Sequence, residues 1–385
     1  MTENTIWLPR AMELGLLDGE LPAGRHDAIT DVAGVRVGHA TMIQGDGPLV
    51  PGTGPVRTGV TVVLPHGGNL FHQKVHAAVH TINGFGKPLG FEQVRELGNI
   101  ESPIALTNTL NVGLVADALV QYCLRQSPEI GIRTSSVNVV VGETNDSTLN
   151  DLQGRHVRAE HVFAALDCAA DGPIPEGAVG AGTGTSCFGW KGGIGTASRI
   201  VPPGAGGYTV GALVQSNFGR ASELVIGGAP VGRTILPPQA VQRVSSAMPY
   251  PAPSADQGSV MIVLATSAPL SSRQLHRLCV RAAAGLARTG SLYGHGSGDF
   301  VIAFSTANLI AHNAPALTGS SETLSDEEQI DWLFRAVVES VEEAVINSLC
   351  AAKTMTGRDG NVRHALPVAR VAALVRAYHL QGERA

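Results

Sequence analysis

The chain has 385 residues, of which 44% are hydrophobic and 15% are charged, so it can bury a large core and has little material for a long solvated tail. A net charge of -5 without any basic block argues against a nucleic-acid partner. The charged first fifteen residues and the lack of a long apolar run predict neither a signal peptide nor a membrane-spanning helix.

The cysteines indicate a reducing compartment. They are dispersed along the chain without a CxxC pair: Cys123, Cys168, Cys187, Cys279 and Cys350. An odd and scattered set favours free thiols in a cytoplasmic protein over disulfides, and it gives no support to a zinc ribbon.

Apolar segments in the first third of the chain predict strands. Residues 29–39 alternate well enough for an edge strand with turns, and residues 58–64 form an apolar strand that ends at Pro65. Histidines then recur at intervals of four, the spacing of one helix face: His72, His76 and His80. No acidic or cysteine partner nearby completes a metal site, so we expect exposed or hydrogen-bonded histidines and no metal.

The middle of the chain predicts helices and strands in alternation. We expect a helix from about Val112 to Arg125, a strand over 137–142 and a helix over about 158–170. The first of these helices should turn three residues inward: Leu114, Ala118 and Leu119. Glu143 follows the strand directly. A carboxylate in that place is either a site residue or an ordinary turn acid, and the residues alone leave both open.

Residues 177–196 are the most glycine-dense segment, yet they match neither common phosphate-binding loop. Trp190 separates Gly189 from Lys191 and no Ser or Thr follows the lysine, so the P-loop spacing fails, as does the dinucleotide spacing GxGxxG. We therefore expect these glycines to allow strands to pack closely or to line a pocket with backbone.

A strand over residues 208–219 should end in the polar amide of Asn217. Glycine, proline and small polar residues dominate residues 227–257, which makes this segment the best linker candidate. Gly258 and Ser259 lie where this segment meets an apolar strand. A serine there is either a plain strand-start residue or the hydroxyl that a self-cleaving N-terminal nucleophile would need.

The last third predicts a strand over 260–266 and a helix over about 272–288, which has an inward stripe of Leu275, Leu278, Cys279, Ala282 and Leu286. Residues 294–305 form a glycine-rich loop that leads into a strand and carries Ser297 and Asp299. Ser297 is not a nucleophile elbow, because His295 stands where GxSxG requires glycine. A last long helix opens with a capping box, Ser325-x-x-Glu328.

A series of short strings runs in order along nearly the whole chain: Ile29–Val35, Thr58–Val62, Leu106–Leu110, Val141–Asp146, Gly180–Gly184, Val214–Asn217, Gly258–Ser259, Gly296–Asp299 and Met355–Gly360. Each string alone is weak evidence, but the ordered set is specific. With it the chain resembles the DmpA-type aminopeptidases, which comprise L-aminopeptidase/D-Ala-esterase/amidases and β-peptidyl aminopeptidases.

The resemblance implies a self-processing hydrolase. Members of that family are made as one inactive chain and cut themselves before a serine, here between Gly258 and Ser259. The single domain 1–385 would become an α chain of 1–258 and a β chain of 259–385. Ser259 would be the N-terminal nucleophile and its own α-amine the general base, whose reference pKa of about 7.7–8.0 suits proton transfer near neutrality.

The resemblance also assigns roles to other residues. Ser297 would hydrogen-bond the α-amine, and Asp299 would orient that network, although the family pattern has glutamate there, which is one methylene longer. Asn217 matches the oxyanion donor. Glu143 matches the acid that binds the free amino group of the substrate. The residues alone would also allow Glu143, Asn217 and Asp299 to be polar caps at strand ends, and the resemblance favours the functional roles.

The implied fold is an α/β, αββα four-layer sandwich, in which two packed β-sheets lie between helix layers, as in the ornithine acetyltransferases. Expected partners are small peptides and amino-acid amides or esters with an L-α-, D-α- or β-amino acid at the N-terminus. The mechanism needs no cofactor and no metal. The αβ units of the family form larger assemblies, so we expect a homo-oligomer.

Two alternatives remain. An amine acyltransferase of the ornithine acetyltransferase type would share the fold, but those enzymes use threonine as the nucleophile, and this chain has Ser259. The other alternative is a non-catalytic, glycine-rich protein that binds phosphate or nucleotide, and the failed loop spacings of residues 177–196 count against it.

Overall fold

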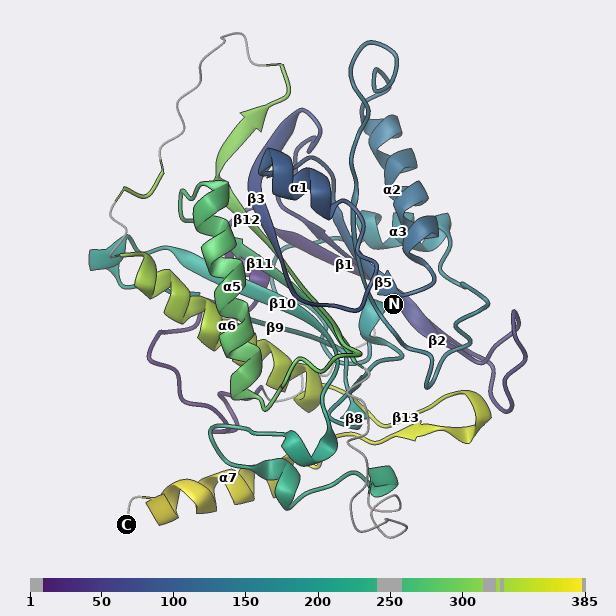
Figure 1. Cartoon of the computed structure of the whole chain (residues 1–385), viewed down its shortest axis with the longest axis vertical. Helices are drawn as coiled ribbons and strands as arrows, with labels where there is room; N and C mark the ends of the chain where they lie inside the picture. The colour runs from purple at the N-terminus through teal and green to yellow at the C-terminus, as the bar shows by residue number, and fades with distance from the viewer. Residues whose placement is uncertain (1–9, 241–257, 314–322, 326–328, 383–385) are drawn as a thin grey trace.

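Two β-sheets form the centre of the molecule in the computed structural model, which describes residues 10–240, 258–313, 323–325 and 329–382 (Figure 1). The larger sheet has the strand order β4 (Asn99–Ile100), β3 (Gln73–Gly84), β12 (Gly298–Ala311), β11 (Ser259–Thr266), β10 (Thr209–Asn217), β9 (Ile194–Ile200). The smaller has the order β1 (Arg36–Gln44), β2 (Val56–Leu64), β5 (Ile104–Asn108), β6 (Val140–Thr144). Neighbours are antiparallel except for the pairs β11–β12 and β5–β6.

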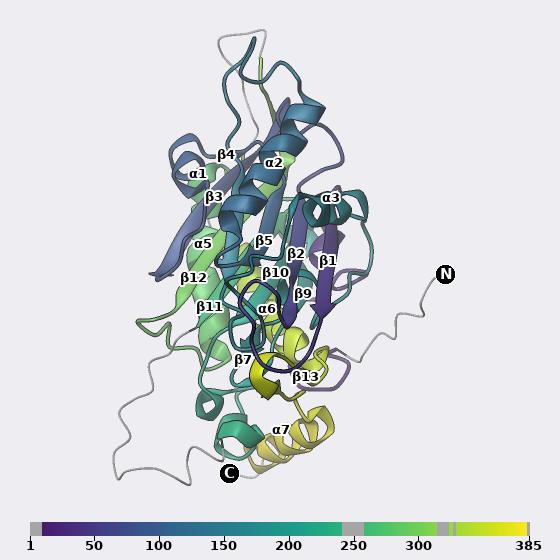
Figure 2. The same ribbon diagram turned by 90° about the vertical axis from the view of Figure 1, so that its right-hand side faces the viewer.

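Helices pack on the outer faces of the two sheets. The larger sheet is covered by α5 (Ser272–Arg288) and α6 (Ile330–Cys350), and the smaller by α2 (Val112–Gln126) and α3 (Ala159–Asp167). Figures 1 and 2 place α2 and α7 toward opposite ends of the molecule. The remaining elements are α1 (Phe91–Leu97), α7 (Val368–Gly382), the ribbons β7 (Ser186–Cys187) with β8 (Trp190–Lys191) and β13 (Met355–Thr356) with β14 (Val362–Arg363), and 3-10 turns at Ile29–Asp31, Gly180–Gly182, Pro203–Ala205, Ala221–Glu223, Val231–Arg233 and Arg358–Gly360.

Strand β11 is buried on both faces, and its side chains alternate between two apolar clusters. Val260, Ile262 and Leu264 join the cluster beneath α5 and α6, whereas Met261 and Val263 join the cluster between the sheets. Successive strand residues point to opposite faces, so odd-numbered residues of β11 face the other sheet. The continuous apolar run of the sequence is thus explained by burial on both sides.

Most of the expected elements are present. The helices expected near 112–125 and 272–288 are α2 and α5, and all five residues of the predicted stripe on α5 are buried. Leu114 is only half-buried on α2. The strand expected at 208–219 is β10, which ends at Asn217 as predicted. α7 was not foreseen.

Several expectations were wrong or incomplete. His72, His76 and His80 do not lie on a helix, because β3 begins at Gln73; even spacing puts His76 and His80 on one face of this strand, where the His80 ring packs edge-on against His276 at 5.3 Å. The edge strand expected at 29–39 starts later, at Arg36.

The linker expected at 227–257 is also only partly described. Residues 227–240 are not a loose linker, since Val231 and Ile235 are fully or almost fully buried. Residues 241–257 and part of the predicted capping box, 326–328, lie outside the described residues, and α6 begins at Ile330.

The dense glycines serve close packing, as expected. A Cβ on Gly195 would lie 1.9 Å from the carbonyl oxygen of Ala344, so α6 rests directly on the backbone of β9. A Cβ on Gly193 would lie 2.0 Å from the carbonyl oxygen of Gly177. Both distances are far below van der Waals contact, so no larger residue fits there without a backbone shift.

A buried ionic cluster joins β9 to α6. Arg199, 1% exposed, lies 2.7 Å from Glu343 and 3.0 Å from Glu339 between their nearest N and O atoms. Burial raises the pKa of Glu343 to about 7; the charge of Asp27 adds to this rise and that of Arg199 opposes it. The cluster therefore ties residues on both sides of Ser259 in the sequence together.

This raised pKa predicts a pH-dependent stability. The folded chain keeps the Glu343 proton up to about pH 7, whereas the group has an ordinary pKa of 4.5. Between these values the folded state binds more protons, so the free energy of unfolding falls as pH rises. Glu343→Gln removes this contribution. Between about pH 5 and pH 7.5 the thermal midpoint of the variant should therefore fall less than the wild-type midpoint does, and the two falls should differ by about 2 °C or more.

Differential scanning fluorimetry across this pH range measures both midpoints. The exposed Glu96 provides the control, since Glu96→Gln should follow the wild-type pH dependence. Parallel curves for wild type and Glu343→Gln would contradict the assignment.

Candidate active site

Ser259 is the first residue of β11 and is 4% exposed. Its backbone lies between two neighbours, opposite Asn217 of β10 on one side and Gly298 of β12 on the other. As an odd-numbered residue of β11, Ser259 directs its side chain into the space between the sheets. The predicted nucleophile is therefore buried at the end of the central strand.

Two donors point at the Ser259 hydroxyl oxygen. The Asn217 Nδ2 donates to it at 3.2 Å, and the backbone N–H of Asn145, which directly follows β6 of the other sheet, donates at 3.2 Å. The Asn217 side chain is itself held, because its Oδ1 accepts from the backbone N–H of Ser186 at 2.9 Å. The two sheets thus each contribute one donor to the same oxygen.

Ser297 and Asp299 form a second buried pair beside the seam. The Ser297 hydroxyl donates to Asp299 Oδ1 at 2.7 Å, and each residue is 1% exposed. In β12, Val301 and Ala303 belong to the cluster beneath the helices, so Asp299 lies on that face by alternation. The pair therefore flanks the backbone of Ser259 and lies on the other side of the sheet from its hydroxyl. Although Asp299 is shorter than glutamate, it reaches Ser297.

Tyr293 adds a contact that the sequence did not suggest. Burial raises the pKa of the Tyr293 phenol, and the negative charge of Asp299 raises it further. The Tyr293 hydroxyl donates to the backbone carbonyl of Ala283 in α5. The loop that carries Ser297 is in this way fastened to the helix that covers the sheet.

Glu143 lies within β6 rather than after it, and it is 3% exposed. Its Oε1 accepts from the backbone N–H of Lys87 at 3.0 Å and lies 3.7 Å from Lys87 Nζ. Glu143 precedes Asn145 by two residues, so β6 carries both a buried carboxylate and the donor to Ser259. Three of the predicted residues, Ser259, Asn217 and Glu143, are therefore gathered at the ends of β10, β11 and β6.

The bond expected to be cut is held at its carbonyl. The backbone N–H of Gly298 donates to the carbonyl oxygen of Gly258 at 3.1 Å. Backbone donors such as Gly298 N–H and Asn145 N–H have no side-chain signature. The strings Val141–Asp146 and Gly296–Asp299 contain them, however, and were the only sequence signal for them.

Two buried titratable residues, Asp146 and Lys191, also went unpredicted. Burial raises the pKa of Asp146 to about 7 and lowers the pKa of Lys191 to about 7, and the charge of each opposes the shift of the other. Lys191 Nζ donates to the carbonyl oxygens of Gly182 and Gly192, at 3.0 and 2.7 Å. Lys191, the lysine of the failed P-loop pattern, is therefore fully buried and hydrogen-bonded to backbone carbonyls, and it is not exposed for binding a phosphate.

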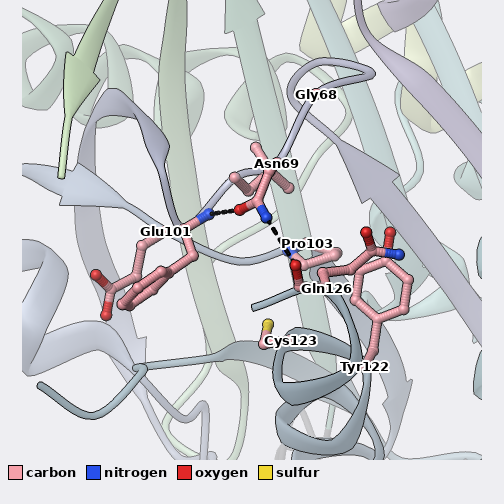
Figure 3. Close-up of a pocket in the computed structure, with 9 residues that line it drawn as sticks. Gly68, Asn69, Glu101, Pro103, Tyr122, Cys123 and Gln126 are labelled. Atoms are coloured by element: carbon pink, nitrogen blue, oxygen red, sulfur yellow. Dashed lines mark hydrogen bonds between the residues drawn. The ribbon is translucent and has the colours of Figure 1, made fainter. Parts of the chain in front are cut away.

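Two hollows of the structure lie away from these residues. One cavity of about 20 Å³ is lined by residues including Asn69, Glu101, Tyr122 and Cys123 (Figure 3). A second, more open hollow of about 350 Å³ shares Glu101 with it. Among the described residues, no cluster of three or more metal-ligating side chains occurs, and no helix is long and apolar enough to cross a membrane.

Comparison with known proteins gives consistent matches over nearly the whole chain. The family model "Peptidase family S58" matches residues 27–363. The β-peptidyl aminopeptidase BapA of Sphingosinicella xenopeptidilytica is 43% identical over 371 residues, which are 96% of this chain and 91% of that protein.

Two solved structures match with the same coverage, 96% of this chain and 99% of theirs. A protein from Pyrococcus horikoshii OT3 has a TM-score of 0.87 and 49% identity. The L-aminopeptidase D-Ala-esterase/amidase from Ochrobactrum anthropi, described as a prototype of the serine aminopeptidases with a variant of the Ntn hydrolase fold, has a TM-score of 0.85 and 38% identity.

These matches identify the chain as a serine-type aminopeptidase with a variant of the Ntn hydrolase fold. The chain belongs to peptidase family S58. The resemblance found in the sequence is thereby confirmed. The match to a peptidase family decides against both alternatives, the acyltransferase and the non-catalytic glycine-rich binding protein.

Proposed function

We propose that the chain cuts itself between Gly258 and Ser259 and then uses Ser259 as an N-terminal nucleophile on small peptides, amides or esters. The observation that carries this proposal is the Ser259 hydroxyl, which is buried at a strand start and contacted by donors from both sheets, Asn217 and Asn145. An ordinary strand-start serine requires no such pair of donors. The products of the cut would be chains of 1–258 and 259–385, which remain one domain.

In the cleavage step the Ser259 oxygen attacks the carbonyl carbon of Gly258, and the C–N bond of that peptide breaks to leave an ester. The hydroxyl proton goes to the departing nitrogen, which becomes the free α-amine of Ser259. Water then hydrolyses the ester, which releases the Gly258 carboxylate and restores the Ser259 hydroxyl. The N–H of Gly298, 3.1 Å from the Gly258 carbonyl oxygen, supports this step because it would stabilise negative charge on that oxygen.

In the mature enzyme the freed α-amine takes the Ser259 proton as the hydroxyl attacks the substrate, and it passes the proton to the leaving amine. Ser297 already donates its own proton to Asp299. Its oxygen can therefore accept a hydrogen bond from the α-amine, which leaves the lone pair of the amine directed elsewhere, toward Ser259. Asp299 would thus orient the base through Ser297.

Asn217 Nδ2 and Asn145 N–H are proposed to stabilise the oxyanion once the substrate carbonyl carbon is bonded to the Ser259 oxygen. Before the reaction both donors lie 3.2 Å from the hydroxyl oxygen of Ser259 itself. The oxyanion is a different atom, the former carbonyl oxygen of the substrate. Glu143 is proposed to bind the N-terminal ammonium of the substrate, since a nearly buried carboxylate favours a cationic partner.

We propose further that the preferred substrates carry a β-amino acid at the N-terminus. The support is the similarity to the β-peptidyl aminopeptidase of Sphingosinicella xenopeptidilytica, at 43% identity over 96% of the chain. The packing of α5 and α6 on one sheet and of α2 and α3 on the other favours an αββα sandwich as the full layer order. An assembly of several αβ units is expected from the family resemblance.

The first of three predictions about this function concerns processing. Wild-type protein should migrate as two fragments in denaturing electrophoresis, with intact masses that meet at Gly258/Ser259, and Ser259→Ala should stay whole because it lacks the attacking hydroxyl. Ser254→Ala, which removes a serine five residues before Ser259, is the matched control and should be processed. A single wild-type chain after long incubation would sink the assignment of the nucleophile.

The second prediction concerns Asn217. In purified, processed enzyme, Asn217→Ala should lower kcat by about 10²–10³, the usual effect of losing one oxyanion donor, with a smaller change in KM. Steady-state kinetics with an aminoacyl p-nitroanilide measure both constants. Asn361→Ala, at an exposed site, serves as the control. A kcat within about threefold of the wild type would exclude the proposed role.

The third prediction concerns the substrate. The kcat/KM for β-alanyl p-nitroanilide should exceed that for L-alanyl p-nitroanilide by about tenfold or more, which corresponds to about 1.4 kcal/mol of transition-state binding. Ser259→Ala measures the background rate. A higher value for the L-alanyl or D-alanyl compound would reverse the proposed preference and leave the proposed nucleophile untouched.

A further inference from the structure

Lys87 lies on the segment between β3 and α1, and this segment passes between two parts of the site. On one side, the backbone N–H of Phe85 donates to the carbonyl oxygen of Ser297 at 3.3 Å. On the other side, a Cβ on Gly86 would lie 3.1 Å from Glu143 Oε1. The segment therefore touches both the loop beside the nucleophile and the carboxylate proposed to bind the substrate ammonium.

The Lys87 ammonium is the cationic partner of Glu143 in the part of the chain that the structure describes. The Glu143 side chain is 4% exposed, whereas the Lys87 side chain is 59% exposed. A carboxylate this deeply buried is costly without a nearby cation. Lys87 thus supplies the positive charge while no substrate is bound, yet it reaches the carboxylate from the solvent side.

The contact between the two groups is loose. Nζ and Oε1 are 3.7 Å apart, beyond the distance of about 2.7–2.9 Å of a charge-assisted hydrogen bond. Lys87 Nζ also has an acceptor of its own, because it donates to Thr109 Oγ1 at 2.5 Å. The lysine can release Glu143 while it keeps that hydrogen bond and its contact with solvent.

The carboxylate would stay in place after such a release. The backbone N–H of Lys87 holds Glu143 Oε1 at 3.0 Å, and this bond does not depend on the lysine side chain. A new cation arriving at the carboxylate would therefore meet an oriented acceptor, and only the side-chain ammonium has to leave.

We propose that Lys87 is a specificity-determining residue whose ammonium stands in for the substrate's N-terminal ammonium at Glu143 and is exchanged for it on binding. This inference rests on the proposed role of Glu143. A competing internal cation lowers the fraction of enzyme that is ready to bind and so raises the apparent KM, without acting on the bound transition state. It also disfavours ligands without a cationic N-terminus, which cannot replace the lost charge.

The test is Lys87→Gln in the processed enzyme, with β-alanyl p-nitroanilide as the substrate. Because the Lys87 side chain is mostly exposed, we expect its ion pair to shift the equilibrium by only about 1.5- to fivefold, so KM should fall by about that factor while kcat stays within about twofold. Lys353→Gln removes one exposed lysine elsewhere and is the matched control for overall charge. A KM that is unchanged or raised in Lys87→Gln, or lowered equally in Lys353→Gln, overturns the proposal.

A double-mutant cycle separates this inference from the function on which it rests. Glu143→Gln should raise KM, and Lys87→Gln added to it should then have no effect on KM, because the exchange needs the carboxylate. If Glu143→Gln leaves KM unchanged, the proposed ammonium site itself is wrong. If Glu143→Gln raises KM but Lys87→Gln does not lower it, the ammonium site stands and only the exchange is refuted.

Discussion

The parallel pairing of β11 with β12 is the constraint on which the rest of the site depends. It sets Ser259 opposite Gly298 and so puts Ser297 and Asp299 beside the backbone of Ser259. A parallel pair requires a crossover connection, which α5 provides, and α5 then covers the outer face of the sheet. β11 is buried on both faces. Its first residue, Ser259, is therefore buried although it lies at the end of the strand, where it meets the segment that follows β6 of the other sheet.

The proposed cut would leave a fold whose parts are bound across the break. β10 precedes the cut and β11 follows it, yet they form one antiparallel ladder from Val210–Thr266 to Asn217–Ser259. Arg199 from before the cut is buried against Glu339 and Glu343 from after it. Since the ladder, the apolar clusters and this ionic cluster all cross the break, separation of the two chains would cost nearly as much as unfolding the sheet.

The sequence predicted those features that a local pattern can carry. The apolar run of β11, the stripe of α5 and the end of β10 at Asn217 all follow from residue type and spacing. The spacing of His76 and His80 wrongly suggested a helix, because an interval of four residues also brings the residues of a strand onto one face. Asn145 N–H and Gly298 N–H could not be predicted from residue type, since every residue has a backbone donor and only the fold aims it. The contact between Lys87 and Glu143 joins residues far apart in sequence, and no pattern in the sequence around either residue predicts it.

The position of Asp299 shows why a shorter acid is compatible with this geometry. Ser297 directly precedes β12 and Asp299 is the second residue of that strand, and their side chains meet without help from the longer glutamate. The 2.7 Å bond commits the serine proton to the carboxylate, so the serine oxygen is left as an acceptor. For a neighbouring amine, the important feature is that the Ser297 hydroxyl donates to Asp299 and can accept from the amine. Tyr293 fastens the loop before Ser297 to α5, which holds the Ser297 hydroxyl in place. The length of the acid is therefore less important for this arrangement than the direction of the hydrogen bond.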